Sequence, residues 1–187
     1  MADAFHLSSG ANDGRTACGA QRVDTRSWFD PKFMLRYALI SNDDWGFNTQ
    51  TMLSPELMRR YVFPWHKRIV QAIHAAGKPA ILHACGQLES VMDDIIDDMK
   101  YDGKHSFEDK ILPVEDAYER WGGRIAILGG IDVDFVCRST PEQVRARSLA
   151  MLKRAETRGA YALGTGNSVP EWVPDENYLA MISAALD

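Results

Sequence analysis

The sequence predicts an α/β fold in which about five βα units contribute parallel strands. From about residue 27 onward, short apolar runs alternate with longer amphipathic stretches. Such alternation is typical of parallel strands joined by helical crossovers. Polar, glycine-rich segments follow the apolar runs: DDWG, HACG, GGIDVD and GTGN. In βα proteins, the active-site and binding residues lie in the loops at these positions.

Each element follows from a local signal, taken in chain order. A first strand is expected at 37–41, and Ser54-Pro55-Glu56 then has the N-cap, proline and acid that begin a helix. That helix should extend to about residue 76 and break near Phe63, because Pro64 cannot donate the interior hydrogen bond. The next strand is expected at 79–84 and an amphipathic helix at 88–99.

The second half repeats the pattern. A strand is expected at 104–107, a short helix at 113–121 and a continuous apolar strand at 124–130 that should be buried on both faces. Thr140-Pro141-Glu142 begins a helix to about residue 158, and a strand at 160–166 precedes a last helix that starts at Pro174. Five units in roughly 160 residues cannot close an eight-unit barrel, which needs about 250. The pattern alone leaves both a small open sheet and a partial TIM barrel.

Residues 1–26 show no periodicity and are rich in small and polar residues. They are expected to form a disordered or loosely attached leader, while residues 27–187 form the βα region. The leader lacks the cationic start and apolar core of a signal peptide, so a cytoplasmic location is expected.

Composition argues against several classes of protein. The net charge is −5 with no basic stripe, which argues against nucleic acid as a partner. The apolar runs are far shorter than the ~20 residues of a membrane helix. Three cysteines in an acidic chain do not suggest a disulfide framework.

His83 and Cys85 form the most informative motif. Residues i and i+2 of a strand point the same way, so both side chains can face one ligand at the end of the 79–84 strand. Imidazole nitrogen and thiolate sulfur together suit Zn²⁺, which makes a bound thiol nucleophilic near neutral pH. The alternative is a hydrogen-bonded core histidine beside a packed cysteine.

Two acids and a tryptophan follow the first strand. Asp43 and Asp44 are candidates for acid–base catalysis, because neighbouring carboxylates can hold different pKa values. Trp45 is a candidate for stacking on a flat substrate. An Asx turn that closes a βα loop explains the same residues without catalysis.

Two further loops are candidate binding segments. Gly130 allows close backbone approach to a ligand and Asp132 offers an acceptor, with a tight turn and a solvated acid pair as the alternative. Backbone N–H groups in the loop of Gly164, Thr165, Gly166 and Asn167 could hold an anion, with a plain turn as the alternative. Glu108 is a possible metal ligand or base.

Taken together, these loops and their flanks resemble the C-terminal half of the uroporphyrinogen decarboxylase superfamily, from about Tyr37 onward. The resemblance rests on DDWGFNTQTMLSPELMRRYVFPWHKRI, GKPAILHACGQL, RIAILGGIDVDFVCRSTPEQVR and YALGTGNSVPEWVPDENYLAMI. It implies a TIM barrel whose earlier strands are not in this chain. The superfamily also holds cobalamin-dependent methyltransferases, including enzymes that methylate a thiol such as coenzyme M.

The resemblance implies specific site chemistry. The methyltransferase branch holds zinc on a His-x-Cys pair, matched by His83 and Cys85, and on a later cysteine, where this chain has Thr165. Cys137 and Glu108 are therefore the candidate third ligands. The decarboxylase branch has histidine in that last loop, so Thr165 departs from this pattern as well.

Three hypotheses follow. The first is metal-assisted methyl transfer, with zinc, a thiol acceptor, a corrinoid as substrate or cofactor, and a corrinoid protein as a possible partner. The second is metal-free decarboxylation of a tetrapyrrole, in which Asp43 or Asp44 stabilises a protonated pyrrole and His83 assists proton transfer. The third is a truncated, non-catalytic barrel fragment whose unpaired strand edges favour a homo-oligomer.

Overall fold

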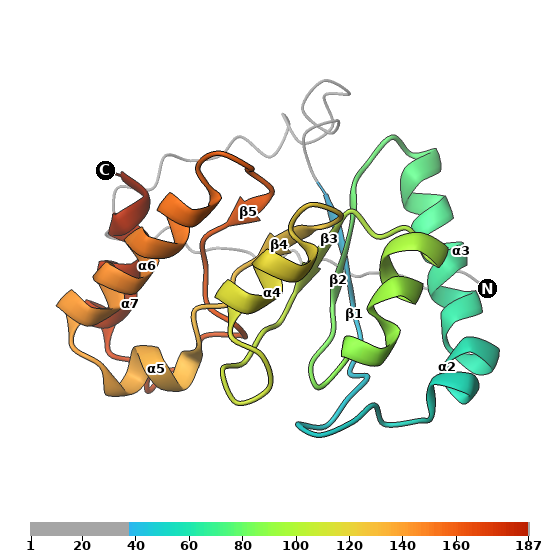
Figure 1. Ribbon diagram of the computed structural model, residues 1–187, viewed down its shortest axis with the longest axis horizontal. Helices are drawn as coiled ribbons and strands as arrows, with labels where there is room; N and C mark the ends of the chain where they lie inside the picture. The colour runs from blue at the N-terminus through green and yellow to red at the C-terminus, as the bar shows by residue number, and fades with distance from the viewer. Residues whose placement is uncertain (1–37, 187) are drawn as a thin grey trace, which may run out of the picture. The chain divides into compact units, whose positions relative to one another are not determined.

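The computed structural model describes residues 38–186 of the chain (Figure 1). The expected leader at 1–26 lies outside these residues. The described part contains no helix that is long and apolar enough to cross a membrane.

One parallel sheet of five strands forms the framework, and its strands neighbour one another in chain order. The strands are β1 (Leu39–Asn42), β2 (Ala80–His83), β3 (Gly103–His105), β4 (Ala126–Leu128) and β5 (Tyr161–Ala162). A doubly wound sheet would reverse the strand order at a switch point, whereas a barrel wall keeps chain order. The expectation of α/β units with parallel strands is confirmed, and the order selects a partial barrel.

The long helix expected at 54–76 is two helices, α2 (Pro55–Tyr61) and α3 (Phe63–Ala75). Ser54 caps the first through its side chain, at 3.4 Å from the Leu57 amide. The break falls at Val62, where Pro64 removes a helical donor as expected.

The helical region after β2 differs from its prediction. One amphipathic α-helix was expected at 88–99, but the chain forms a 3₁₀ turn, η2 (Glu89–Val91), and a π turn, η3 (Asp94–Asp98). Val91, Ile95 and Met99 are nevertheless buried, as the apolar spacing predicts. These turns keep the same apolar residues inward as an α-helix would, so apolar periodicity in the sequence does not distinguish them from an α-helix.

The remaining helices lie close to their expected positions, with one exception. The short helix α5 (Val133–Arg138) was not expected, because its first two residues belong to the GGIDVD loop and six residues carry little periodicity. Asp132 caps it by accepting from the Phe135 amide at 3.1 Å. The helices are α4 (Val114–Trp121), α5 (Val133–Arg138), α6 (Pro141–Ala155) and α7 (Asp175–Ser183), followed by the 3₁₀ turn η4 (Ala184–Leu186).

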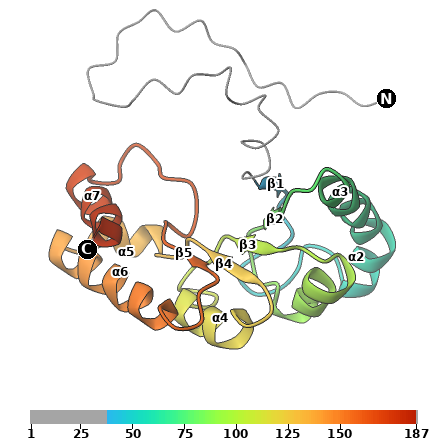
Figure 2. The same ribbon diagram turned by 90° about the horizontal axis from the view of Figure 1, so that it is seen from above.

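The two faces of the sheet are unequal. Ala80, Leu82 and Ile127 are fully buried on the face that α3 and α4 cover, and Figure 2 shows the helices along that side of the strands. On the opposite face, Ile81 and Leu128 are only half-buried. The expectation that the 124–130 strand is buried on both faces is therefore wrong for the described residues, because helices cover one face only.

The loops after the strands are tied together by backbone hydrogen bonds. The Ile131 amide donates to the Gly164 carbonyl at 3.0 Å, and the Gly166 amide donates back to Ile131 at 2.7 Å. The Phe107 amide donates to the Gly166 carbonyl at 3.1 Å. The segments after β3, β4 and β5 therefore form one connected rim at the carboxyl ends of the strands.

Candidate functional site

His83 and Cys85 lie together at the carboxyl end of β2, as their spacing predicts. The Nε2 atom of His83 is 3.7 Å from the Cys85 sulfur. Both side chains are half-buried. The sequence could place them on one side of a strand, and the structure adds that their donor atoms face one another.

The Cys85 sulfur also accepts two hydrogen bonds from distant segments. The Ser106 hydroxyl, just after β3, donates to it at 3.2 Å, and the Asn167 side-chain amide donates at 3.4 Å. Burial raises the pKa of the Cys85 thiol, and the negative charge of Asp44 adds to the increase, despite these two donors. Unaided, the thiol therefore stays protonated at neutral pH.

His83 has a second partner that the sequence did not suggest. Its Nδ1 lies 2.7 Å from Nδ1 of His105, the residue that pairs with it in the register of β2 and β3. The other nitrogen of His105 is 3.1 Å from the Thr165 carbonyl oxygen. Burial lowers the pKa of both histidines, and the positive charge of Lys104 contributes to both decreases, so both rings are neutral near pH 7.

The acids after β1 have separate surroundings. The Asp43 carboxylate accepts from the Trp45 indole at 2.9 Å and faces Nε2 of His66 at 3.1 Å. His66 is buried, and its Nδ1 lies 2.8 Å from the Tyr101 hydroxyl. Asp44 is exposed and lies close enough to Cys85 and His83 to influence their pKa values.

Trp45 does not have the surroundings of a substrate platform. Its side chain is only 2% exposed, and its ring packs against Phe63 at a centroid distance of 5.3 Å and against His66 at 4.7 Å. Both Phe63 and His66 belong to α3. Its role in the described structure is therefore to pack in the core and orient Asp43.

The glycines of the predicted binding loops allow close packing between segments of this chain. Gly130 has a φ of +98°, and an added Cβ would lie 2.3 Å from the Val114 side chain. A Cβ on Gly166 would lie 2.0 Å from the Phe107 carbonyl oxygen, whereas on Gly164 it would meet the Gly129 backbone at 3.4 Å. These contacts account for Gly130 and Gly166 without a ligand.

The polar residues of these loops make different contacts. Asp132 is buried and, besides capping α5, accepts from the Asp109 amide at 2.8 Å. The Thr165 hydroxyl donates to the Asn167 carbonyl at 2.7 Å, so it turns into its own loop. Asn167 is the member of the last loop whose side chain reaches Cys85.

A cavity of about 280 Å³ lies beside Asn167 at this rim. Of the residues singled out from sequence, Asp132, Gly166, Asn167 and Glu108 line it. Lys110 and Asp134 add one charge of each sign to the wall. Asn167 lines this cavity and also contacts the Cys85 sulfur, so its side chain connects the two.

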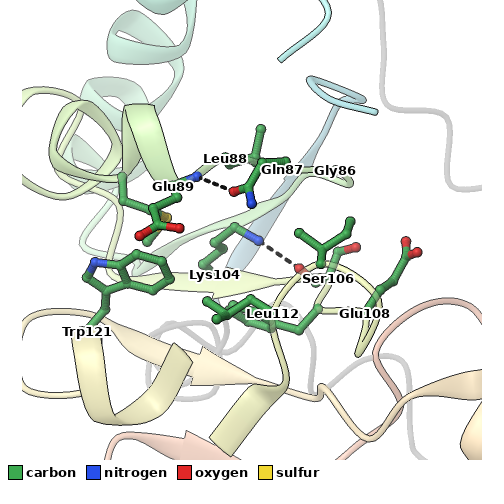
Figure 3. Close-up of a pocket in the computed structure, with 12 residues that line it drawn as sticks. Gly86, Gln87, Leu88, Glu89, Lys104, Ser106, Glu108, Leu112 and Trp121 are labelled. Atoms are coloured by element: carbon green, nitrogen blue, oxygen red, sulfur yellow. Dashed lines mark hydrogen bonds between the residues drawn. The ribbon is translucent and has the colours of Figure 1, made fainter. Parts of the chain in front are cut away.

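Lys104 is a buried cation that sequence reasoning missed. Its ammonium donates to the Ser106 carbonyl at 2.7 Å (Figure 3). It also donates to the carbonyls of Ala84 and His105 at 3.4 Å each. The adjoining cavity of about 20 Å³ has room for a single water molecule. The lysine therefore joins the ends of β2 and β3 rather than facing a substrate.

The expected third metal ligand is not brought to the pair. Within residues 38–186, no three His, Cys, Asp or Glu side chains are grouped so that they could hold a metal ion. Cys137 is a free, half-buried thiol on α5, and Glu108 faces Lys104 and the two cavities. His83 and Cys85 thus remain a pair of donors.

Comparisons with known proteins agree with this architecture. The solved structure of a methyltransferase from Methanosarcina mazei is similar, with a TM-score of 0.62 and 19% sequence identity over 79% of this chain. At this identity the likeness shows a shared fold, and the present chain spans 41% of that one. A search of curated proteins found no match. The family model for uroporphyrinogen decarboxylase matches residues 38–187, and the chain therefore belongs to the uroporphyrinogen decarboxylase family.

Proposed function

We propose that this chain carries the thiol-activating centre of a methyl-transfer enzyme, with His83 and Cys85 as zinc ligands. The methyl donor would be a corrinoid, free or carried by a partner protein, and the acceptor a thiol. The observation that carries the proposal is the 3.7 Å separation of His83 Nε2 and Cys85 Sγ. The methyltransferase from Methanosarcina mazei supports it at the level of the fold.

The donor pair fits zinc in part. With Zn–N bonds of about 2.0–2.1 Å and Zn–S bonds of about 2.3 Å, a tetrahedral ion separates nitrogen and sulfur by about 3.6 Å. The observed separation is close to that edge length. A catalytic zinc ordinarily has three protein ligands, and the described residues supply two of them as a group.

The protonation states of Cys85 and His83 show which change a bound zinc ion would have to cause. Burial keeps the Cys85 thiol protonated near neutral pH, whereas His83 is neutral and has a nitrogen lone pair. Bound zinc would stabilise the thiolate form of a coordinated thiol. Ser106 and Asn167 would remain as donors that orient the Cys85 sulfur.

The acceptor's polar end would occupy the cavity beside Asn167. That cavity opens between the loop after β3 and the loop after β5, and its wall carries Lys110, Glu108 and Asp134. The polar end of the acceptor would lie among these charged side chains.

The test combines metal content with methyl transfer. Protein purified without chelator should contain near-stoichiometric zinc by mass spectrometry, and His83→Ala and Cys85→Ala should both lose it. Cys137→Ala, which removes a thiol outside the pair, is the matched control and should retain zinc. Loss of the methylcobalamin absorbance in the presence of coenzyme M should require both His83 and Cys85.

A folded parent that binds no zinc would overturn this mechanism.

Decarboxylation of a tetrapyrrole is the second candidate, because Trp45 and His66 hold the half-exposed Asp43 carboxylate in a fixed position. Porphyrinogen binding without metal would favour it. A protein that binds neither ligand would favour the non-catalytic fragment; the expected cytoplasmic location is a prediction in all three cases.

A further inference from the structure

A chain of polar contacts runs behind His83, on the side away from Cys85. It passes from His83 Nδ1 to His105 Nδ1 at 2.7 Å, and from His105 Nε2 to the Thr165 carbonyl at 3.1 Å. The chain thus joins β2, β3 and the loop after β5. The two imidazole rings lie 4.9 Å apart between centroids.

The carbonyl end of the chain determines where the protons lie. A carbonyl oxygen only accepts, so Nε2 of His105 carries a proton and donates to Thr165. When the His105 ring is neutral, its Nδ1 is then an acceptor. A separation of 2.7 Å between two lone pairs would be repulsive, so His83 donates from its Nδ1. A neutral His83 therefore has no proton on Nε2.

We propose that His105 is a positioning residue that holds His83 in the Nδ1–H tautomer and directs the bare Nε2 lone pair at the Cys85 side of the site. The inference rests on the proposed function only in giving that lone pair a metal to bind. A metal-binding imidazole commonly donates its other N–H to a carbonyl or carboxylate. Here His105 is the acceptor in place of a carbonyl or carboxylate, and His105 in turn donates to the Thr165 backbone carbonyl.

The surroundings of His105 leave its ring little freedom. A Cβ on Gly129 would lie 2.9 Å from Cδ2 and Nε2 of the ring, so glycine makes room for the imidazole there. The Thr165 carbonyl is fixed in turn, because residue 165 forms a parallel bridge with Ile131. The acceptor for His105 is therefore part of the rim and does not depend on a mobile side chain.

The tautomer can be measured directly by NMR, without metal and without turnover. In metal-free protein labelled with ¹⁵N-histidine, at a pH where the rings are neutral, the nitrogen shifts should show His83 protonated on Nδ1 and bare on Nε2. His105→Leu removes the acceptor, and the His83 signals should move towards the Nε2–H form. His105→Asn keeps an acceptor oxygen near the original Nδ1 and should restore the parent pattern.

Zinc affinity supplies a second readout. His105→Leu should weaken zinc binding by about 10- to 100-fold, as is usual when the partner of a ligating histidine is lost, while His105→Asn should lose less. Amide spectra would verify that each variant is folded. If His105→Leu did not fold, the tautomer of His83 in the parent and in His105→Asn would still test the inference.

A parent His83 protonated on Nε2, or a tautomer unchanged in folded His105→Leu, would overturn the inference whatever the enzyme does. The expected tautomer in a protein that binds no zinc and transfers no methyl group would overturn the proposed function alone.

Discussion

The Asn167 side-chain amide donates a hydrogen bond to the Cys85 sulfur at 3.4 Å, although 82 positions separate the two residues in sequence. The contact joins the loop after β5 to the loop after β2. Thr165, which stands where the resemblance to the methyltransferases expects a cysteine, directs its hydroxyl to the Asn167 carbonyl instead. Asn167 is therefore the position of this loop from which a side chain reaches the His83–Cys85 pair.

A cysteine at this position should complete a metal site. In Asn167→Cys a second sulfur would lie beside the pair as a third ligand, so zinc affinity should rise by at least about tenfold, because three ligands replace two. Competition with a chromogenic chelator would measure the change. Ser168→Cys, which adds a thiol at the exposed neighbouring position, should have no such effect. Equal affinities in the two variants would contradict the geometry.

Gly86 should tolerate no side chain. It has a φ of +94°, and an added Cβ would lie 2.2 Å from the carbonyl carbon of Gly46 in the loop after β1. Gly86→Ala should therefore lower the free energy of unfolding by roughly 2 kcal/mol or more, through backbone strain and overpacking. Chemical denaturation would measure it. Gly123→Ala is the control, since an added Cβ there meets nothing within 4 Å, and a similar loss in both would refute the explanation.

Arg147 should be important for attaching α6. Its guanidinium contacts Asp109 at 2.6 Å and Glu115 at 2.8 Å, and its side chain is 17% exposed. Burial alone would raise the pKa of Glu115, but the hydrogen bonds from Arg147 hold it below its usual value. Arg147→Met should cost about 3 kcal/mol, because it leaves two half-buried carboxylates without their cation.

The matched control for Arg147 is Arg138→Met. Arg138 pairs with Asp134 on the same short helix, but its side chain is 79% exposed. Solvent-exposed pairs contribute little, so the loss should be below about 1 kcal/mol. Thermal or urea unfolding would separate the two variants, and losses of the same size would show that the half-buried network of Arg147 has no special role.

Lys104 should give the protein a specific pH dependence. Burial lowers the pKa of its ammonium from 10.5 to about 7 in the folded state. Between these values the unfolded chain binds more protons, so the free energy of unfolding should rise with pH. From about pH 7 to pH 9 the increase from this group is about 2 kcal/mol.

The Lys104→Met variant isolates this contribution. The difference between parent and variant should grow in favour of the parent as the pH rises over that range, when unfolding is followed by circular dichroism. A difference that does not change with pH would mean that the three carbonyl acceptors keep the ammonium charged in the folded protein.

The local structure and the chemistry of individual residues could be predicted from the amino-acid sequence. Apolar runs and caps predicted the strands and most helices, because periodicity and end signals depend on neighbours along the chain. The i, i+2 spacing predicted that His83 and Cys85 would face one ligand. Short or irregular elements such as α5 and η3 escaped prediction, since few residues carry their signals.

Which distant residues meet depends on how the strands and loops pack in the folded chain. Strand order selected a partial barrel wall over a doubly wound sheet. The register set His105 beside His83, and the rim brought Asn167 to Cys85. Tertiary packing also buried Trp45, and it left His83 and Cys85 without Cys137 as a third ligand. These outcomes depend on packing between segments far apart in the chain, and no local pattern encodes which of them will be neighbours.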